Sequence, residues 1–414
     1  MSNNKIIITG IGILSSNAKG KEDYWTALKE GRNGSKEIDL FDTQQFPINV
    51  GGQVSDFEPQ KYMGKKGLRS LDRSTKMLVS ASKMAVEDCG LEITDDNTDQ
   101  IGVSVGTTLG SVKSISDFDE ATLKEGPRYT NPAHFPNTVI NSSASQVSIW
   151  NNIQGFNATI STGFTASIDA MRYAYDFINR DRVKVVFAGG VEEMCLQTFY
   201  GFYALKFLSG SIEGDKYINA PFDKRRNGIT FGEGACLLAI EDYDHAKKRE
   251  ANMMAEILGF GYWFDPYRIN KYNPSGVGVK KAICNALDSA GMDIGEVDCI
   301  FANANSTKAA DKIESHAIRE VFGRYADKIP VSATKSMLGE CFSVSGAFSV
   351  AAAVGAIVNG FIPPTIGLKE VCSDCDLDYI PGNHGRKLNL KNALIVSFGP
   401  NGSCSCVIVG RVSE

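Results

Sequence analysis

Histidine is scarce in this sequence, which has four among its 414 residues, and its ten cysteines are scattered without a repeated spacing. The one CxxC, Cys372 to Cys375, has no second cysteine pair or nearby histidine, so it is weak as a zinc or redox motif. These absences exclude the usual zinc-binding domains. We expect no metal, no other cofactor and mostly buried free thiols.

An excess of positive charge and a long uninterrupted apolar run are missing as well. The formal net charge is -5, which argues against a nucleic-acid-binding protein and gives no reason to expect a membrane surface. The N-terminal stretch lacks a basic segment followed by a long apolar one, so no signal peptide is expected. We expect no transmembrane segment and a cytoplasmic protein whose partners are proteins or small molecules.

What the sequence does contain is a regular alternation of short apolar runs with helical patterns. A hydrophobic fraction of 43% and a charged fraction of 22% are ordinary for a globular chain of this length. The alternation predicts an α/β fold with mostly parallel, buried strands. The strands are expected within residues 5–12, 100–106, 157–161, 183–190, 235–242, 253–262, 299–304, 329–334, 393–399 and 404–412.

The elements recur in similar order, which predicts two related halves, residues 1–250 and 251–414. Each half reads as strand, helix, strand, a turn that opens a helix, and a hairpin-like end. The helix expected at residues 346–360 is apolar on every side, so it should be buried. We therefore expect the halves to pack helix against helix between two sheets.

A turn in the first half raises the functional question. Residues 158–160 read as the end of a strand, Gly163 as a tight turn, and the residues after Thr165 as a helix. Such a turn presents one side chain at a helix N-terminus, where backbone N–H groups and the helix dipole stabilise a thiolate or an oxyanion. The residue presented is Phe164, which offers no such chemistry.

Several stretches spread over nearly the whole chain together carry a resemblance to a family. The chain resembles the β-ketoacyl-[acyl carrier protein] synthases of the thiolase fold. The resemblance implies a five-layer αβαβα architecture of two similar halves, a dimer, and condensation of acyl chains held on an acyl carrier protein. The stretches that carry it are residues 6–34, 69–92, 220–249, 334–340, 375–382 and 397–403.

The catalytic positions of condensing relatives are changed in this sequence. The nucleophilic cysteine is matched by Phe164, the first family histidine by Asn303 and the second by Glu340. The lysine of the TKSM stretch is retained as Lys335, which the resemblance places in a structural polar network with Asp311 and Glu314. The glycine-rich gating loop reads Phe398, Gly399 and Pro400, with proline where relatives carry a gating phenylalanine.

These changes remove the chemistry of condensation. A Claisen condensation needs a thiolate to hold the acyl chain and imidazoles to stabilise the enolate. Phe164 has no lone pair, Asn303 does not exchange a proton near neutral pH, and Glu340 brings a negative charge. No catalytic residue is therefore expected, although an acyltransferase or decarboxylase with a relocated site at Glu340 and Cys341 is an alternative.

One subfamily gives such a chain a role. The sequence is similar to the chain length factor (KSβ) of type II polyketide synthases, in which a homologue without the active-site cysteine pairs with a catalytic ketosynthase (KSα). The resemblance implies a heterodimer, an acyl carrier protein and a growing polyketide chain as partners. It also implies control of chain length in making an aromatic polyketide or an aryl polyene. The usual replacement of the cysteine there is glutamine, so Phe164 departs from it. A homodimeric acyl-binding scaffold is a further alternative.

The resemblance assigns three more sets of residues. The tunnel for the growing chain would be lined after the second strand, and the strand before the nucleophile position would pair across the two-fold axis, with residues 133–137 reaching toward the partner. A basic run falls where relatives dock the acyl carrier protein, although a solvated helix face explains it equally well. The tunnel residues are Ser111, Ser114 and Phe118, the interface residues are Ala158, Thr159, Ile160, Ser161 and Thr162, and the docking residues are Lys65, Lys66, Arg69 and Arg73.

Overall fold

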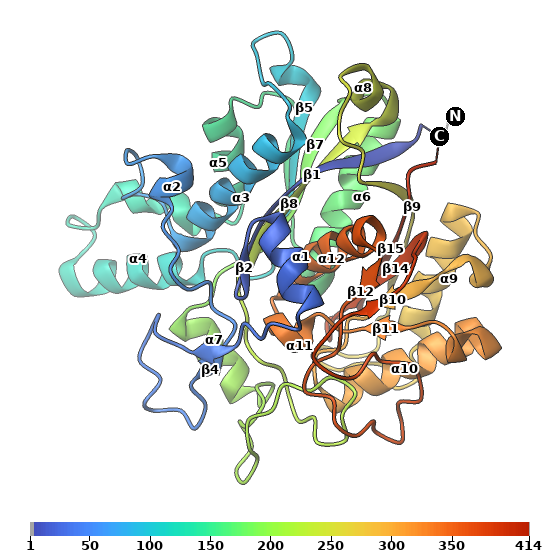
Figure 1. Cartoon of the computed structure of the whole chain (residues 1–414). Helices are drawn as coiled ribbons and strands as arrows, with labels where there is room; N and C mark the ends of the chain where they lie inside the picture. The colour runs from blue at the N-terminus through green and yellow to red at the C-terminus, as the bar shows by residue number, and fades with distance from the viewer. Residues whose placement is uncertain (1–3, 414) are drawn as a thin grey trace.

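The computed structural model describes residues 4–413, so residues 1–3 and 414, at the outer ends of the two predicted halves, lie outside the described part. The chain forms a large mixed sheet with helices between and around its two parts (Figure 1). The strands of the first half are β1 (Ile6–Ser15), β2 (Ala18–Lys19), β3 (Lys36–Glu37), β4 (Val50–Gly51), β5 (Ile101–Gly106), β6 (Asn157–Ile160), β7 (Val185–Glu192) and β8 (Gly234–Asp242). Those of the second half are β9 (Ala255–Phe264), β10 (Cys299–Phe301), β11 (Val331–Ser332), β12 (Phe361–Ile362), β13 (Arg386–Lys387), β14 (Asn392–Phe398) and β15 (Ser403–Gly410).

The helices alternate with these strands. In the first half they are α1 (Lys21–Lys29), α2 (Gln60–Met63), α3 (Arg73–Cys89), α4 (Val112–Glu125), α5 (Ser142–Asn151), α6 (Ala166–Asn179), α7 (Leu196–Ala204) and α8 (Tyr243–Lys248). In the second half they are α9 (Val277–Ala290), α10 (Lys308–Phe322), α11 (Lys335–Leu338) and α12 (Ser345–Asn359). Short 3-10 turns include η2 (Pro132–Thr138), η3 (Gly163–Thr165) and η6 (Phe342–Val344).

The strand order shows that the two halves repeat one topology. The sheet runs β11-β10-β14-β15-β9 in the second half and β1-β8-β7-β5-β6 in the first. When only these five strands of each half are counted and both sets are read from the outer edge inward, each has the same spatial order: third, second, fourth, fifth and first. The ten predicted strands are all present, and the repeat inferred from the sequence is confirmed at the level of topology.

Two expectations about the sheet are corrected. The strands are not mostly parallel, because β8 and β15 return antiparallel beside β7 and β14, as the hairpin-like ends of the halves require. The two five-stranded parts are also not separate. They touch where β1 pairs with β9 through Ile7 with Glu256 and Ile8 with Ala255, which makes the sheet continuous.

The layers follow from which faces are apolar. Helices α3 and α5 cover the outer face of the first part of the sheet, and α9 with α10 covers that of the second. Between the two parts lie α6 and α12, which contact each other. This gives the expected five layers.

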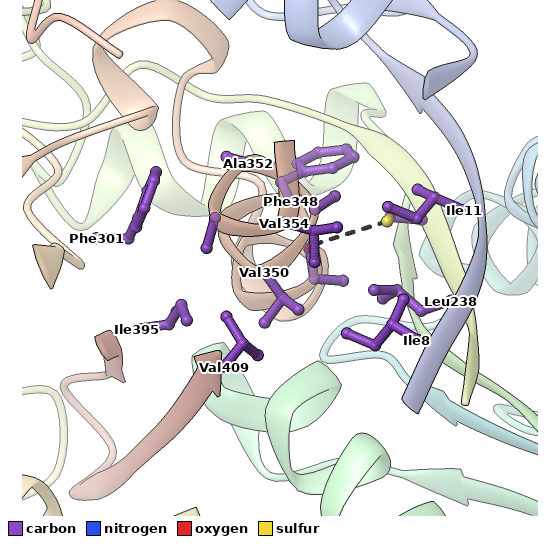
Figure 2. Close-up of a cluster of buried hydrophobic side chains, with 14 of the residues drawn as sticks. Ile8, Ile11, Leu238, Phe301, Phe348, Val350, Ala352, Val354, Ile395 and Val409 are labelled. Carbon is purple, nitrogen blue, oxygen red and sulfur yellow. Dashed lines mark hydrogen bonds between the residues drawn. The ribbon is translucent and has the colours of Figure 1, made fainter. Parts of the chain in front are cut away.

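Helix α12 is the centre of the largest core. Together with the turn η6 before it, α12 forms a stretch, Phe342–Asn359, that is long and apolar enough to cross a membrane, with a mean hydropathy of 1.6, but 89% of it lies inside the protein. The expectation that no apolar stretch reaches transmembrane length is therefore wrong, although this stretch is buried in the protein. Figure 2 shows why the helix is a core helix: Val350 and Val354 lie among Ile8, Leu238 and Val409 from the strands around them.

Candidate functional site

The turn before α6 places Phe164 where a nucleophile would stand. Strand β6 ends at Ile160, Gly163 has a φ of 78°, which favours glycine, and α6 begins at Ala166. The strand, turn and helix predicted from the sequence are confirmed. Phe164 is 5% exposed, and its carbonyl accepts a hydrogen bond from Ser397 Oγ at 3.0 Å.

The ring of Phe164 begins a cluster of aromatic side chains, which we call the aromatic cluster. It lies edge-on to Phe342, with ring centroids 5.2 Å apart. The ring centroid of Phe342 lies 4.7 Å from that of Phe202, on which it stacks, and 4.9 Å from that of Phe231. The ring of Phe231 lies 6.1 Å from that of Phe199. An acyl chain attached at position 164 would have to occupy the space that these rings fill. The aromatic cluster was not predicted from the sequence.

Asn303 follows β10 and has its side chain fixed by two donors. Its Oδ1 accepts from Lys335 Nζ at 2.9 Å and from the backbone N–H of Phe398 at 3.3 Å. Its Nδ2 is buried and has no hydrogen-bond partner. The amide is therefore held as an acceptor toward Lys335, and it supplies neither a general base nor a general acid.

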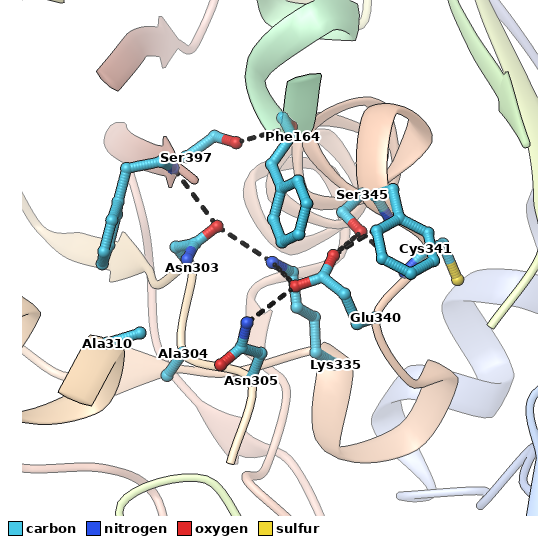
Figure 3. A network of polar contacts seen from close by, with 12 residues as sticks. Phe164, Asn303, Ala304, Asn305, Ala310, Lys335, Glu340, Cys341, Ser345 and Ser397 are labelled. Carbon is cyan, nitrogen blue, oxygen red and sulfur yellow. Dashed lines mark hydrogen bonds and ion pairs between the residues drawn. The ribbon is translucent and has the colours of Figure 1, made fainter. Parts of the chain in front are cut away.

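Lys335 and Glu340 form a buried ion pair, with Nζ 2.8 Å from Oε2. The same oxygen accepts from Asn305 Nδ2 at 2.9 Å, while Oε1 accepts from the N–H of Phe342 at 3.0 Å and from Ser345 Oγ at 2.9 Å. Figure 3 shows this network beneath the ring of Phe164. Every oxygen of Glu340 is thus satisfied and its charge is neutralised, so the carboxylate is a structural group.

The network that the resemblance implies for Lys335, Asp311 and Glu314 connects them through Asn303 and Asn305, without a direct bond from Lys335 to either acid. Glu314 accepts the backbone N–H groups of Asn303 at 2.7 Å and Ala304 at 2.8 Å. Asp311 accepts those of Asn305 at 3.0 Å and Phe222 at 2.8 Å. Burial raises the pKa of Glu314 to about 8 and that of Asp311 to about 6. Both acids therefore hold the loop after β10 in place through its backbone N–H groups.

Cys341 does not offer a relocated nucleophile. It is 1% exposed, and its sulfur lies 3.7 Å from the carbonyl of Glu233. Burial raises the pKa of this thiol well above its ordinary value, and the charge of Glu340 raises it further. Figure 3 shows the sulfur directed away from the carboxylate of Glu340, so the two groups do not form a catalytic pair.

The gating loop closes over the aromatic cluster. Phe398 is 2% exposed and lies edge-on to Tyr272 at 5.6 Å. A Cβ on Gly399 would be 3.2 Å from Phe164 Cβ, so the loop backbone contacts that side chain. Pro400 is buried, and its ring restricts the backbone of the loop.

Of the three predicted tunnel residues, one lines a cavity. This cavity, of about 500 Å³, lies between α3, α4, η2 and the start of α7, and Ser114 is on its wall. Ser111 is 6% exposed and its Oγ lies 3.5 Å from Glu193 Oε1, a wall residue. Phe118 packs on Phe135 at 5.9 Å and does not line this cavity, so its place in a tunnel stays a prediction.

Three of the five residues predicted for the dimer interface lie on the edge strand β6, and Ser161 and Thr162 follow its end. β6 pairs on one side with β5 and has no strand on its other side in the described part of the chain. Residues 158–160 are half-buried and Ser161 is exposed. An uncovered edge offers backbone donors and acceptors to another strand.

The four residues of the basic run differ in their exposure. Lys65, Lys66 and Arg69 are exposed. Arg73 is half-buried, and its guanidinium donates to the fully buried Glu233 at 2.5 Å and 2.9 Å. Glu233 was not found from the sequence as the partner of Arg73, because it lies 160 residues further along the chain.

No group of three or more histidine, cysteine, aspartate or glutamate side chains among residues 4–413 is arranged to hold a metal ion. The duplicated five-layer fold, the turn before α6 and the loops after β10 and β11 define a ketosynthase-type protein of the thiolase fold. Its nucleophile position holds a phenylalanine.

Comparison with known proteins supports this class. Residues 3–246 match the family model "Beta-ketoacyl synthase, N-terminal domain" and residues 254–369 match "Beta-ketoacyl synthase, C-terminal domain". The chain belongs to the β-ketoacyl synthase family.

Similar proteins carry two kinds of description. The chain is 34% identical over 415 residues to 3-oxoacyl-[acyl-carrier-protein] synthase 2 of Coxiella burnetii, with 100% of each chain covered. It is 32% identical to a solved ishigamide ketosynthase/chain length factor, with a TM-score of 0.92 and coverage of 99% of this chain and 100% of the other. A structure titled as a type II PKS acyl-carrier protein in complex with its ketosynthase bound to the hexaketide has 27% identity, a TM-score of 0.90 and the same coverage.

Proposed function

We propose that this chain is a non-condensing ketosynthase homologue that pairs with a catalytic ketosynthase and acts as its chain length factor in a type II polyketide synthase. The observation that carries the proposal is Phe164 at the nucleophile position, with the aromatic cluster filling the space behind it. The neutralised pair of Lys335 and Glu340 completes the argument, since it occupies the place where proton-transferring groups would stand.

The heterodimer supplies what this chain lacks. The catalytic residues would come from the partner, the edge strand β6 would pair with the partner's strand, and an acyl carrier protein would deliver the units of the growing polyketide. The solved ketosynthase/chain length factor and the ketosynthase complex with an acyl-carrier protein support this assembly by similarity of fold and sequence. The curated relatives are named as synthases, and the replacements at positions 164, 303 and 340 are the reason for a different role here.

The test is co-expression with a catalytic ketosynthase (KSα) of a type II polyketide synthase. The expected result is a 1:1 complex that condenses malonyl units, together with no condensation by this chain alone. Replacing the partner's nucleophilic cysteine should abolish condensation. A stable homodimer that never yields the 1:1 complex would instead favour an acyl-binding scaffold and overturn the proposal.

A second experiment tests the alternative that catalysis uses a relocated site at Glu340 and Cys341. Cys341→Ala in the complex should leave the condensation rate unchanged, as should Cys236→Ala, a control at another buried thiol. Loss of activity in Cys341→Ala alone would show that this chain does its own chemistry.

A further inference from the structure

The CxxC of the second half lies in a tight turn near the surface. The backbone N–H of Cys375 donates to the carbonyl of Cys372 at 2.8 Å, so Ser373 and Asp374 form the centre of a β-turn. A β-turn holds its first and fourth Cα atoms within about 7 Å, and disulfides span about 4.4 to 6.8 Å between Cα atoms. The turn therefore brings the two Cα atoms within the range that a disulfide can span.

The two thiols differ in accessibility. Cys372 is one of two cysteines with partial exposure, the other being Cys284, while Cys375 is buried. An exposed thiol followed three residues later by a buried one is the arrangement of an attacking and a resolving cysteine.

The surroundings of Cys372 favour its thiolate. The guanidinium of Arg226 lies beside the sulfur, and although burial opposes ionisation, hydrogen bonds from Arg226 and from the backbone lower the pKa of this thiol. Arg226 is anchored by the carbonyls of Asp223 and Lys308, each at 3.1 Å, but its buried Nε has no hydrogen-bond partner. The cation is thus fixed in position with hydrogen-bonding capacity left over.

We propose that Cys372 and Cys375 are a thiol oxidation site at which a low-molecular-weight disulfide, such as glutathione disulfide, converts the pair to an intramolecular disulfide. The Cys372 thiolate attacks one sulfur of glutathione disulfide, which forms a mixed disulfide and releases one glutathione thiolate. Cys375 then attacks the Cys372 sulfur of the mixed disulfide and releases the second glutathione. The two protein thiols lose two electrons and two protons, and the two glutathione molecules released carry them.

Oxidation reaches the network around Asn303 through Arg226. The bridge removes the Cys372 thiol group as a hydrogen-bond partner of the guanidinium. Arg226 Nε lies 3.6 Å from Asp311 Oδ2, and Asp311 holds the backbone N–H of Asn305, whose side chain bonds Glu340. A change at the turn of residues 372–375 thus reaches the loop after β10 through the contacts of Arg226 and Asp311.

The test uses the whole chain and glutathione disulfide as the oxidant. Peptide mass mapping after alkylation should show the loss of two free thiols, confined to the peptide that contains residues 372–375. Cys375→Ser should stop at a stable glutathione adduct on Cys372, and Cys372→Ser should show neither adduct nor bridge. Cys372 should react with glutathione disulfide faster than Cys284, the other partly exposed thiol and the matched control.

Two results would overturn the proposal. One is equal modification of Cys284 and Cys372 in the native protein over the same pH range. The other is a Cys375→Ser variant that remains folded by circular dichroism and carries no glutathione on Cys372. Neither outcome depends on whether the chain pairs with a ketosynthase.

Discussion

Nζ of Lys335 and Oε2 of Glu340 lie 2.8 Å apart in the interior, where both side chains are almost wholly shielded from water. Removing one partner leaves the other as an uncompensated buried charge. Lys335→Met should therefore lower the free energy of unfolding by about 3 to 5 kcal/mol, measured by urea denaturation. The double variant Lys335→Met with Glu340→Gln should recover part of that loss. A loss in the single variant no larger than in the double variant would contradict the pairing.

Phe164→Cys alone should not produce a condensing enzyme. The new thiol would have no histidine near it, because positions 303 and 340 hold asparagine and glutamate. The rate of ketoacyl product formation by the isolated variant, followed by mass spectrometry of the carrier-protein adduct, should equal that of the unmodified chain. Condensation by the single variant would show that the network around Lys335 is catalytic.

Phe164→Ala should destabilise the fold because it removes a ring packed on Phe342. Truncating a buried phenylalanine typically costs about 3 to 5 kcal/mol. Phe264→Ala is the matched control, since Phe264 is 61% exposed, and its effect should stay within about 0.5 kcal/mol. Equal urea midpoints for the two variants would show that the aromatic cluster contributes little to stability.

Glu193 should make stability depend on pH. Burial raises the pKa of its carboxyl from 4.5 to about 8, so the folded chain keeps a proton that the unfolded chain releases. The free energy of unfolding should then fall as pH rises from about 5 to about 8 and level off above that, by an amount on the order of a few kcal/mol. Glu193→Gln should flatten the curve, while Glu314 keeps part of the slope. An unchanged slope in Glu193→Gln would contradict the assignment.

Ala158→Lys should prevent the proposed heterodimer while leaving the monomer folded. A charge on the half-buried edge strand β6 would be left unpaired against a partner strand. Native mass spectrometry of the co-expressed proteins should show loss of the 1:1 complex. His316→Lys, on the outer helix α10, is the control that should keep it. An intact complex in Ala158→Lys would place the interface elsewhere.

Ser114→Trp should shorten the product of such a complex, because Ser114 lines the cavity of about 500 Å³. Asp119→Trp lies on the same helix away from the cavity and should leave the product unchanged. Chromatography of the released polyketides checks the length. Identical products from both variants would exclude this cavity as the place where the chain ends.

The sequence predicted the elements better than the contacts. All ten main strands and the turn at Gly163 carry local signals, namely apolar runs and a glycine before a helix. The antiparallel return of β8 and β15 has no such signal, since strand direction depends on the path of the long connections. The link between β1 and β9 likewise depends on how the halves twist together.

The candidate site shows the same division. The replaced residues at positions 164, 303 and 340 are visible in the sequence, because each stands in a motif. The pairing of Lys335 with Glu340 is not visible in the sequence. The two residues do not lie on one face of a helix, because the chain turns between them at Gly339, which has a φ of 82°. The aromatic cluster is hidden for a similar reason, because Phe202, Phe231 and Phe342 come from distant segments.

The aromatic cluster also bears on the stability of the fold. An enzyme that must admit a long substrate keeps a void or a loosely packed space in its core, and natural proteins give up stability for such sites. Here that space is occupied by the chain's own rings, so the protein needs no ligand to complete its interior. Restoring condensation in this chain would therefore require opening the aromatic cluster as well as changing positions 164, 303 and 340.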